Sequence, residues 1–293
     1  MIVTDLKYYL ENRLLPKLDL MIKRCEQNQP KKDALLIVEG GEGEGKTNTS
    51  IALAYYFKSK TKRDIHMFFK LQNLIEFAKS HEKKIIIWDE PAIDSLSTDW
   101  YKKANKDLMR LLMTARKKRH IFIFNLTRFY KFSEYIVVDR SICLIHMYSR
   151  REIETGRFAY IKRGSLEFLY NSYRFGKKRR YRDLCTIRGG FPEVLEKHFH
   201  KMGIYVEGKI ATSLEEYDKF KDEAILSIGV GSKKKDKYVA KFVLLCELLT
   251  KKYKVQQKEI AEYLTSYDEP LSKQNISKML VSLHEETTSK EQL

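Results

Sequence analysis

The chain has 293 residues, of which 43% are hydrophobic and 32% are charged. This composition is typical of a folded protein with room for two domains, and it excludes disorder for most of the chain. Lys and Arg outnumber Asp and Glu by 56 to 39, and the net charge of +17 makes nucleic acid the leading partner class, ahead of an anionic membrane surface.

The apolar runs are too short to cross a membrane. The longest, such as 85–88 and 242–246, fall far below the roughly 18 to 20 residues that a bilayer requires. The first residues lack the basic and apolar regions of a secretory signal, and the four cysteines are far apart with no CxxC pair. We therefore expect no membrane span, no structural zinc knuckle and a cytoplasmic location.

The chain opens with a predicted helix and continues into an alternating pattern. Residues 1–33 predict a helical segment over 5–27 that Pro16 should kink or divide. From residue 34 to 150, short apolar strands alternate with longer helical stretches. The predicted strands are 35–39, 65–69, 84–89, 121–125 and 142–147, and the predicted helices are 46–58, 71–81, 100–118 and 132–139. Such alternation predicts an α/β nucleotide-binding core, a parallel sheet with helices on both faces.

The pattern changes after residue 150. Residues 151–228 predict an extension of the core, with a hairpin through Gly156, Tyr160 and Gly164, a basic run over 174–182 and amphipathic pieces near 192–202 and 213–226. Residues 229–236 have the composition of a flexible linker. Three helices are expected in 237–293, as a small helix-turn-helix or winged-helix-like domain.

A glycine-rich loop carries the strongest chemical signal. Residues 40–47, GGEGEGKT, match GxxxxGK[ST] between an apolar strand and a helix. In such a loop, backbone N–H groups surround phosphates, the lysine reaches the β and γ oxygens, and the hydroxyl ligates Mg²⁺. We expect ATP and Mg²⁺ as cofactors, and the predicted nucleotide-binding residues are Gly40, Gly41, Gly43, Glu44, Gly45, Lys46, Thr47 and Asn48.

Two further strands end in polar side chains. The strand 84–89 ends in Asp89, expected to join Thr47 at the metal, and is followed by Glu90, expected to orient and deprotonate the attacking water. The strand 121–125 ends in Asn125, which would lie beside the catalytic strand if the sheet places it between the two Walker strands. Asn125 would then hold the lytic water or sense the γ-phosphate; an ordinary turn role is the alternative.

Basic residues supply the remaining candidates. Arg116, Arg119 or Arg128 could act as an arginine finger on a neighbouring subunit, with Arg116 taken as the representative, although cations at a helix C-terminus are favoured in any case. Nucleic-acid contacts are predicted in the basic run, where Phe175 and Tyr181 could add stacking, and in the tail helix that resembles a recognition helix. The predicted contact residues are Lys177, Lys178, Arg179, Arg180, Lys273, Gln274, Asn275 and Lys278. A solvated loop and a protein-interaction module are the respective alternatives.

Taken together, the loop 40–47, the segment Trp88-Asp89-Glu90, the helix 100–119 with its segment 111–117, and the polar end 125–128 resemble the HerA/FtsK class of P-loop ATPases. Within that class, the similarity is greatest to zonula-occludens-toxin-like and archaeal mobile-element members. The resemblance implies a RecA-like core in a homo-oligomer, usually a hexameric ring, that uses ATP to move double-stranded DNA. Asn125 departs from the Gln of many members.

Two other functions fit the same motifs. A AAA+ replication initiator or helicase loader would share the Walker residues but should carry a helical lid in 151–191. An ATP-switched DNA-binding regulator would turn over slowly. We expect the motor.

Overall fold

The computed structural model describes residues 8–89, 98–150, 154–175, 181–191 and 195–229. The chain divides into two compact units, residues 1–226 and 227–293. The predicted tail domain over 237–293 lies outside the described residues, as does the predicted linker except for Gly229.

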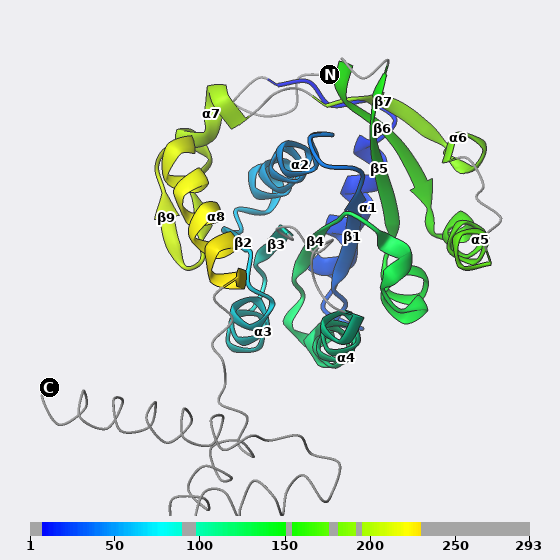
Figure 1. Cartoon of the computed structure of the whole chain (residues 1–293), viewed down its shortest axis with the longest axis horizontal. Helices are drawn as coiled ribbons and strands as arrows, with labels where there is room; N and C mark the ends of the chain where they lie inside the picture. The colour runs from blue at the N-terminus through cyan, green and yellow to red at the C-terminus, as the bar shows by residue number, and fades with distance from the viewer. Residues whose placement is uncertain (1–7, 90–97, 151–153, 176–180, 192–194, 230–293) are drawn as a thin grey trace, which may run out of the picture. The chain divides into compact units, whose positions relative to one another are not determined.

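A nine-stranded sheet forms the centre of the first unit, in the order β7-β6-β5-β1-β4-β3-β2-β8-β9 (Figure 1). The six strands from β5 to β8 are parallel, whereas β6 is antiparallel to β5 and β7, and β9 is antiparallel to β8. The strands are β1 (Ala34–Glu39), β2 (Ile65–Phe68), β3 (Ile85–Asp89), β4 (Ile121–Leu126), β5 (Cys143–Arg150), β6 (Glu154–Lys162), β7 (Ile187–Gly190), β8 (Ile204–Val206) and β9 (Lys209–Ala211). The expected α/β fold with a mostly parallel sheet is confirmed.

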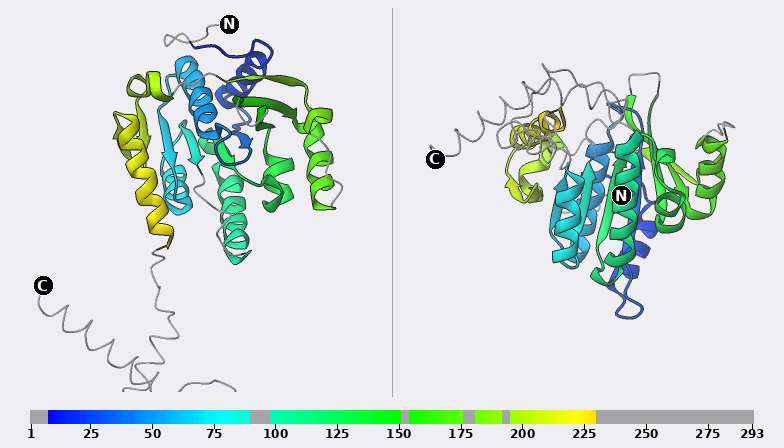
Figure 2. Two further views of the ribbon diagram at one scale, coloured as in Figure 1. Left: turned by 45° about the horizontal axis from the view of Figure 1, so that its top comes forward. Right: turned by 60° about the horizontal axis from the view of Figure 1, so that its bottom comes forward.

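The helices lie on both faces of this sheet. They are α1 (Leu15–Glu26), α2 (Lys46–Thr61), α3 (Leu71–Ser80), α4 (Thr98–Thr114), α5 (Arg163–Arg174), α6 (Tyr181–Leu184), α7 (Leu195–Met202) and α8 (Leu214–Gly229), with 3-10 turns η2 (Ala115–Lys118) and η3 (Phe129–Lys131) and a π-helical turn η4 (Tyr135–Arg140). One apolar cluster joins α1, α2, α7 and α8 to one face, and a second joins α3, α4, η4 and α5 to the other. Figure 2 shows α8 along the β2–β9 edge from two further directions.

Alternation along β1 explains why both faces are covered. Leu36 and Val38 belong to the first cluster, whereas Leu35 and Ile37 belong to the second. Side chains of a strand point alternately to opposite faces, so a strand buried on both sides must be apolar throughout. The layers are compatible with a RecA-like or Rossmann-like core.

The sheet order shows that the strand ending in Asn125 lies between the two predicted Walker strands. β4 lies between β1 and β3, and its residue Asn125 is paired in register with Asp89 on one side and with Val38 on the other. The two predicted Walker strands are thus separated by one strand, and the polar ends of β3 and β4 lie next to each other.

Three predicted features differ from the structure in their bounds or type. Residues 8–14 are not helical, and Pro16 lies at the start of α1 instead of kinking a longer helix. Proline is tolerated there because the N–H groups of the first helical turn have no partner within the helix, so the N–H that proline lacks is not missed. The hairpin is β5–β6, with Gly156 in its second strand, whereas Gly164 belongs to α5. The helix expected over 132–139 is the shorter turn η4.

None of the described helices combines the length and the apolar character needed to cross a bilayer.

Candidate active site

The glycine-rich loop lies between the carboxyl end of β1 and the amino end of α2. Gly45 caps α2 with φ of 88°, a left-handed conformation that favours glycine. A β-carbon on Gly40 would lie 2.7 Å from the carbonyl oxygen of Met147 on β5. The loop therefore runs against the neighbouring strand where only glycine fits.

Lys46 is held by the loop itself. Its Nζ donates hydrogen bonds to the carbonyl oxygens of Gly40, at 2.9 Å, and Gly41, at 2.5 Å. Burial lowers the pKa of Lys46 below its ordinary value, and the nearby carboxylates of Asp89, Glu39 and Glu42 oppose that effect. The ammonium thus sits at the mouth of the loop, where it can contact phosphate oxygens.

Thr47 and Asp89 are brought together as predicted for a metal pair. Thr47 Oγ1 donates to Asp89, at 3.2 Å from Oδ1 and 3.0 Å from Oδ2. The hydroxyl oxygen keeps its lone pairs while it donates, so both residues offer oxygen ligands of the kind that Mg²⁺ prefers. Among the described residues, no group of three or more His, Cys, Asp or Glu side chains forms a metal site. A Mg²⁺ ion here would need phosphate and water as its other ligands.

Asn125 completes this carboxylate environment from β4. Its Nδ2 donates to Asp89 Oδ1 at 2.7 Å, and its Oδ1 accepts a hydrogen bond from Ser50 of α2. Asn125 is 1% exposed and Asp89 is 5% exposed. The nitrogen and the oxygen of the Asn125 side-chain amide thus both belong to a buried network that aligns Asp89. Contact of Asn125 with the lytic water or the γ-phosphate stays a prediction.

A second carboxylate network lies on the other side of the loop. Glu39 ends β1, is buried, and is 2.6 Å from Nδ1 of His146 on β5. The hydroxyl of Tyr181 donates to Glu39 at 3.2 Å, and its ring stacks on His146 with centroids 3.4 Å apart. The Tyr181 ring is thus engaged within the protein through His146, and its stacking on a nucleic acid stays a prediction. Sequence reasoning missed Glu39 and His146, whose separation of 107 residues leaves no local signal.

The other predicted residues of the loop differ in their burial and contacts. Glu44 accepts a hydrogen bond from Ser149 of β5 at 2.7 Å, which ties the middle of the loop to the sheet. Asn48 is half-buried in the first turn of α2. Gly41 and Gly43 are exposed. Glu90 lies outside the described residues, as do Lys177, Lys178, Arg179, Arg180, Lys273, Gln274, Asn275 and Lys278.

The three candidate finger residues lie at different edges of the sheet. Arg128 directly follows β4 at the carboxyl edge, on the same side as the glycine-rich loop. Arg116 lies in η2, which precedes β4 at the opposite, amino edge of the sheet. Both side chains are exposed.

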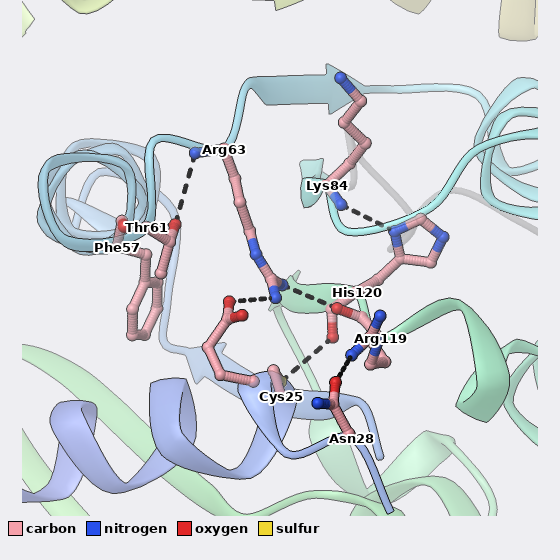
Figure 3. A network of polar contacts seen from close by, with 9 residues as sticks. Cys25, Asn28, Phe57, Thr61, Arg63, Lys84, Arg119 and His120 are labelled. Atoms are coloured by element: carbon pink, nitrogen blue, oxygen red, sulfur yellow. Dashed lines mark hydrogen bonds and ion pairs between the residues drawn. The ribbon is translucent and has the colours of Figure 1, made fainter. Parts of the chain in front are cut away.

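Arg119 belongs to a structural network at that amino edge (Figure 3). The guanidinium of Arg63 donates to the carbonyl oxygen of Arg119 at 2.7 Å and to Glu26 at 2.5 Å, while Arg119 donates to Asn28 at 3.2 Å. These bonds join the end of α1 to the turns before β2 and β4. Loss of activity in an Arg119 variant would therefore not identify a finger.

Tyr217 is a further site residue that the sequence did not reveal. It lies in the first turn of α8, is 3% exposed, and donates its hydroxyl to Asp89 Oδ2 at 3.0 Å. The sequence predicted an amphipathic piece over 213–226, but nothing in its pattern identified a partner 128 residues away.

No protein-family model and no curated protein matches this chain.

Proposed function

We propose that this chain is a Mg²⁺-dependent ATPase of the HerA/FtsK type that couples ATP turnover to the binding and translocation of double-stranded DNA. One observation carries the proposal: Asp89 is hydrogen-bonded both to Thr47 of the glycine-rich loop and to Asn125 of the strand inserted between the two Walker strands. A glycine-rich turn with no role in nucleotide binding does not require that convergence.

Each residue then has a chemical task. The loop amides and Lys46 bind the phosphate oxygens, and Thr47 with Asp89 holds the metal. Mg²⁺, when bound, supplies positive charge to the β and γ oxygens. Asn125 keeps Asp89 oriented through its amide nitrogen. Glu90, as the sequence predicts, accepts the proton of the attacking water.

The added strands favour a motor over a AAA+ initiator. The initiator hypothesis requires a helical lid in 151–191, but β6 and β7 extend the sheet there and only α5 and α6 are helical among the described residues. This supports a RecA-like motor, which by its resemblance would act as a homo-oligomeric ring, usually a hexamer.

Variants of the loop lysine and of the general base test the ATPase. Lys46→Ala should weaken nucleotide binding, because it removes the cation at the loop mouth. Glu90→Gln should retain ATP but abolish turnover, because an amide cannot accept the proton. Lys60 is an exposed cation on the same helix. Lys60→Ala is therefore the matched control and should change neither nucleotide binding nor turnover. Normal hydrolysis by Glu90→Gln would remove the base assignment, and absence of hydrolysis by the wild-type chain would refute the ATPase proposal.

The DNA part is tested by salt dependence. Residues 233–293 hold only 12 of the 56 basic side chains and 9 of the 39 acidic ones, so the larger part of the chain should supply most phosphate contacts. Neutralising Lys177, Lys178, Arg179 and Arg180 together should reduce the slope of log K against log salt by up to roughly 4. Deleting 233–293 should preserve DNA-stimulated hydrolysis and reduce sequence preference. If the quadruple variant keeps the wild-type salt slope and the deletion of 233–293 loses all DNA binding, the tail and not the larger part supplies the phosphate contacts. If DNA does not stimulate hydrolysis, the ATP-switched regulator is favoured.

The ring is tested by mixing inactive subunits. Arg116→Ala or Arg128→Ala mixed with Glu90→Gln should regain partial activity if the arginine acts across an interface, since some interfaces combine both intact halves. Failure of both mixtures would remove the finger assignment.

A further inference from the structure

The buried contact between Tyr217 and Asp89 shows that the candidate metal site is not built by the Walker segments alone. Asp89 is the acceptor of three donors: Asn125 at Oδ1, Tyr217 at Oδ2, and Thr47 shared between both oxygens. A carboxylate has about four lone-pair positions. Asp89 is thus held at both oxygens by side chains from α2, β4 and α8.

Tyr217 is the donor in its contact with Asp89. Its hydroxyl lies 3.0 Å from Oδ2, and an ionised carboxylate only accepts hydrogen bonds, so the phenol donates. A protonated phenol beside an ionised carboxylate makes a charge-assisted hydrogen bond, which is stronger and more directional than a neutral one.

The ring of Tyr217 is buried against two other aromatic rings. It packs between Phe69, with centroids 5.9 Å apart, and Phe199, with centroids 5.8 Å apart. The start of α8 is fixed by two hydrogen bonds: Ser213 Oγ accepts from the Glu216 amide at 3.2 Å, and the Glu216 carboxylate accepts from the Thr212 amide at 2.7 Å. Ring packing and the bonds at the start of α8 together hold the hydroxyl beside Asp89.

From this geometry we infer that Tyr217 is a positioning residue for the metal-binding carboxylate, so that α8 completes the Mg²⁺ site of the proposed ATPase. Partners that orient a metal ligand contribute about 10- to 100-fold to metal affinity or activity. This inference rests on the proposed function.

The test separates metal affinity from nucleotide affinity. Tyr217→Phe removes one hydroxyl and keeps the packed ring. It should raise the Mg²⁺ concentration for half-maximal ATP hydrolysis about tenfold. Binding of a fluorescent ADP analogue in EDTA should stay within a factor of two. Tyr205→Phe is the matched control. Tyr205 lies on β8, and its ring stacks on that of His66 with centroids 4.8 Å apart. This variant should change neither the Mg²⁺ requirement nor the binding of the ADP analogue.

Each other outcome is decisive. An unchanged Mg²⁺ requirement overturns the positioning role, and a lowered requirement overturns it too, since the hydroxyl would then compete with the metal. Hydrogen exchange of wild-type α8 provides a reading that needs no variant: Mg²⁺ added with nucleotide should slow exchange over 217–224, and equal exchange with and without Mg²⁺ counts against the inference. If the wild-type chain binds no nucleotide with or without Mg²⁺, the proposed function itself fails and the inference with it.

Discussion

Gly40 is the residue of the loop at which a single methyl group should do the most damage. An added β-carbon would lie 2.7 Å from the Met147 carbonyl oxygen and 3.0 Å from its β-carbon. β5 is paired with β1 through Glu39 and His146, so neither strand can move away without breaking that ladder. Overpacking of this kind costs about 1–3 kcal/mol.

That cost should appear in stability, in nucleotide affinity, or divided between them. If the loop shifts instead of the sheet, the same 1–3 kcal/mol corresponds to a loss of roughly 5- to 150-fold in affinity. Urea unfolding and titration with a fluorescent ADP analogue measure the two parts. Gly41→Ala is the control, because its β-carbon would meet nothing closer than the side chain of Glu44 at 3.5 Å. Equal behaviour of the two variants would show that the contact with β5 does not constrain the loop.

Three further predictions concern groups away from the loop. Asp33→Asn should lower the free energy of unfolding by about 3–5 kcal/mol in urea, because Arg140 would stay buried without its charged partner; replacing both residues by Leu should cost less, and an additive loss would contradict this. Burial lowers the pKa of His66 from 6.5 to about 4, so the unfolded chain binds the proton first and stability should fall as pH drops from 6.5 to 4. His66→Phe should therefore raise the free energy of unfolding by about 1 kcal/mol at pH 5, after allowance for solvent at the ring edge, and leave it unchanged at pH 8. The same pH dependence of stability in the variant and the wild type would refute this. Tyr181→Phe should lower the unfolding free energy by about 1–2 kcal/mol through loss of its bond to Glu39, and no loss would show that the stack on His146 suffices.

The parts of this fold that were predictable depend on short stretches of sequence. The loop 40–47 has a fixed spacing of residue types, and the strands β1, β3 and β4 are continuous apolar runs because both of their faces are covered. The pairing of Asp89 with Thr47 follows from these two features, since a loop after one parallel strand and the end of another meet at the same edge. Pattern reasoning therefore located the first half of the site.

The missed parts depend on contacts between distant segments. β8 and β9 have three residues each, too few for a period to be recognised, yet they extend the sheet beyond β2 and lead into α8. The capping signal Ser213 to Glu216 was readable, but it fixes where α8 begins and not which side chain it faces. Glu39 looked like the last residue of a strand, and only its register opposite His146 reveals a buried pair.

The charges around Lys46 give the metal a larger role in the proposed function than the loop motif alone would suggest. The carboxylates of Asp89, Glu39 and Glu42 all favour the charged form of Lys46, and Glu44 is held at the loop by Ser149. Carboxylates so near a phosphate-binding loop repel a polyanion, and in a partly buried site that repulsion is weakly screened. The net charge of +17 therefore does not assist at this point of the chain. Mg²⁺ held by Asp89 would turn one of these repulsive groups into an attractive one, so nucleotide binding should depend steeply on Mg²⁺ and on each residue that orients Asp89.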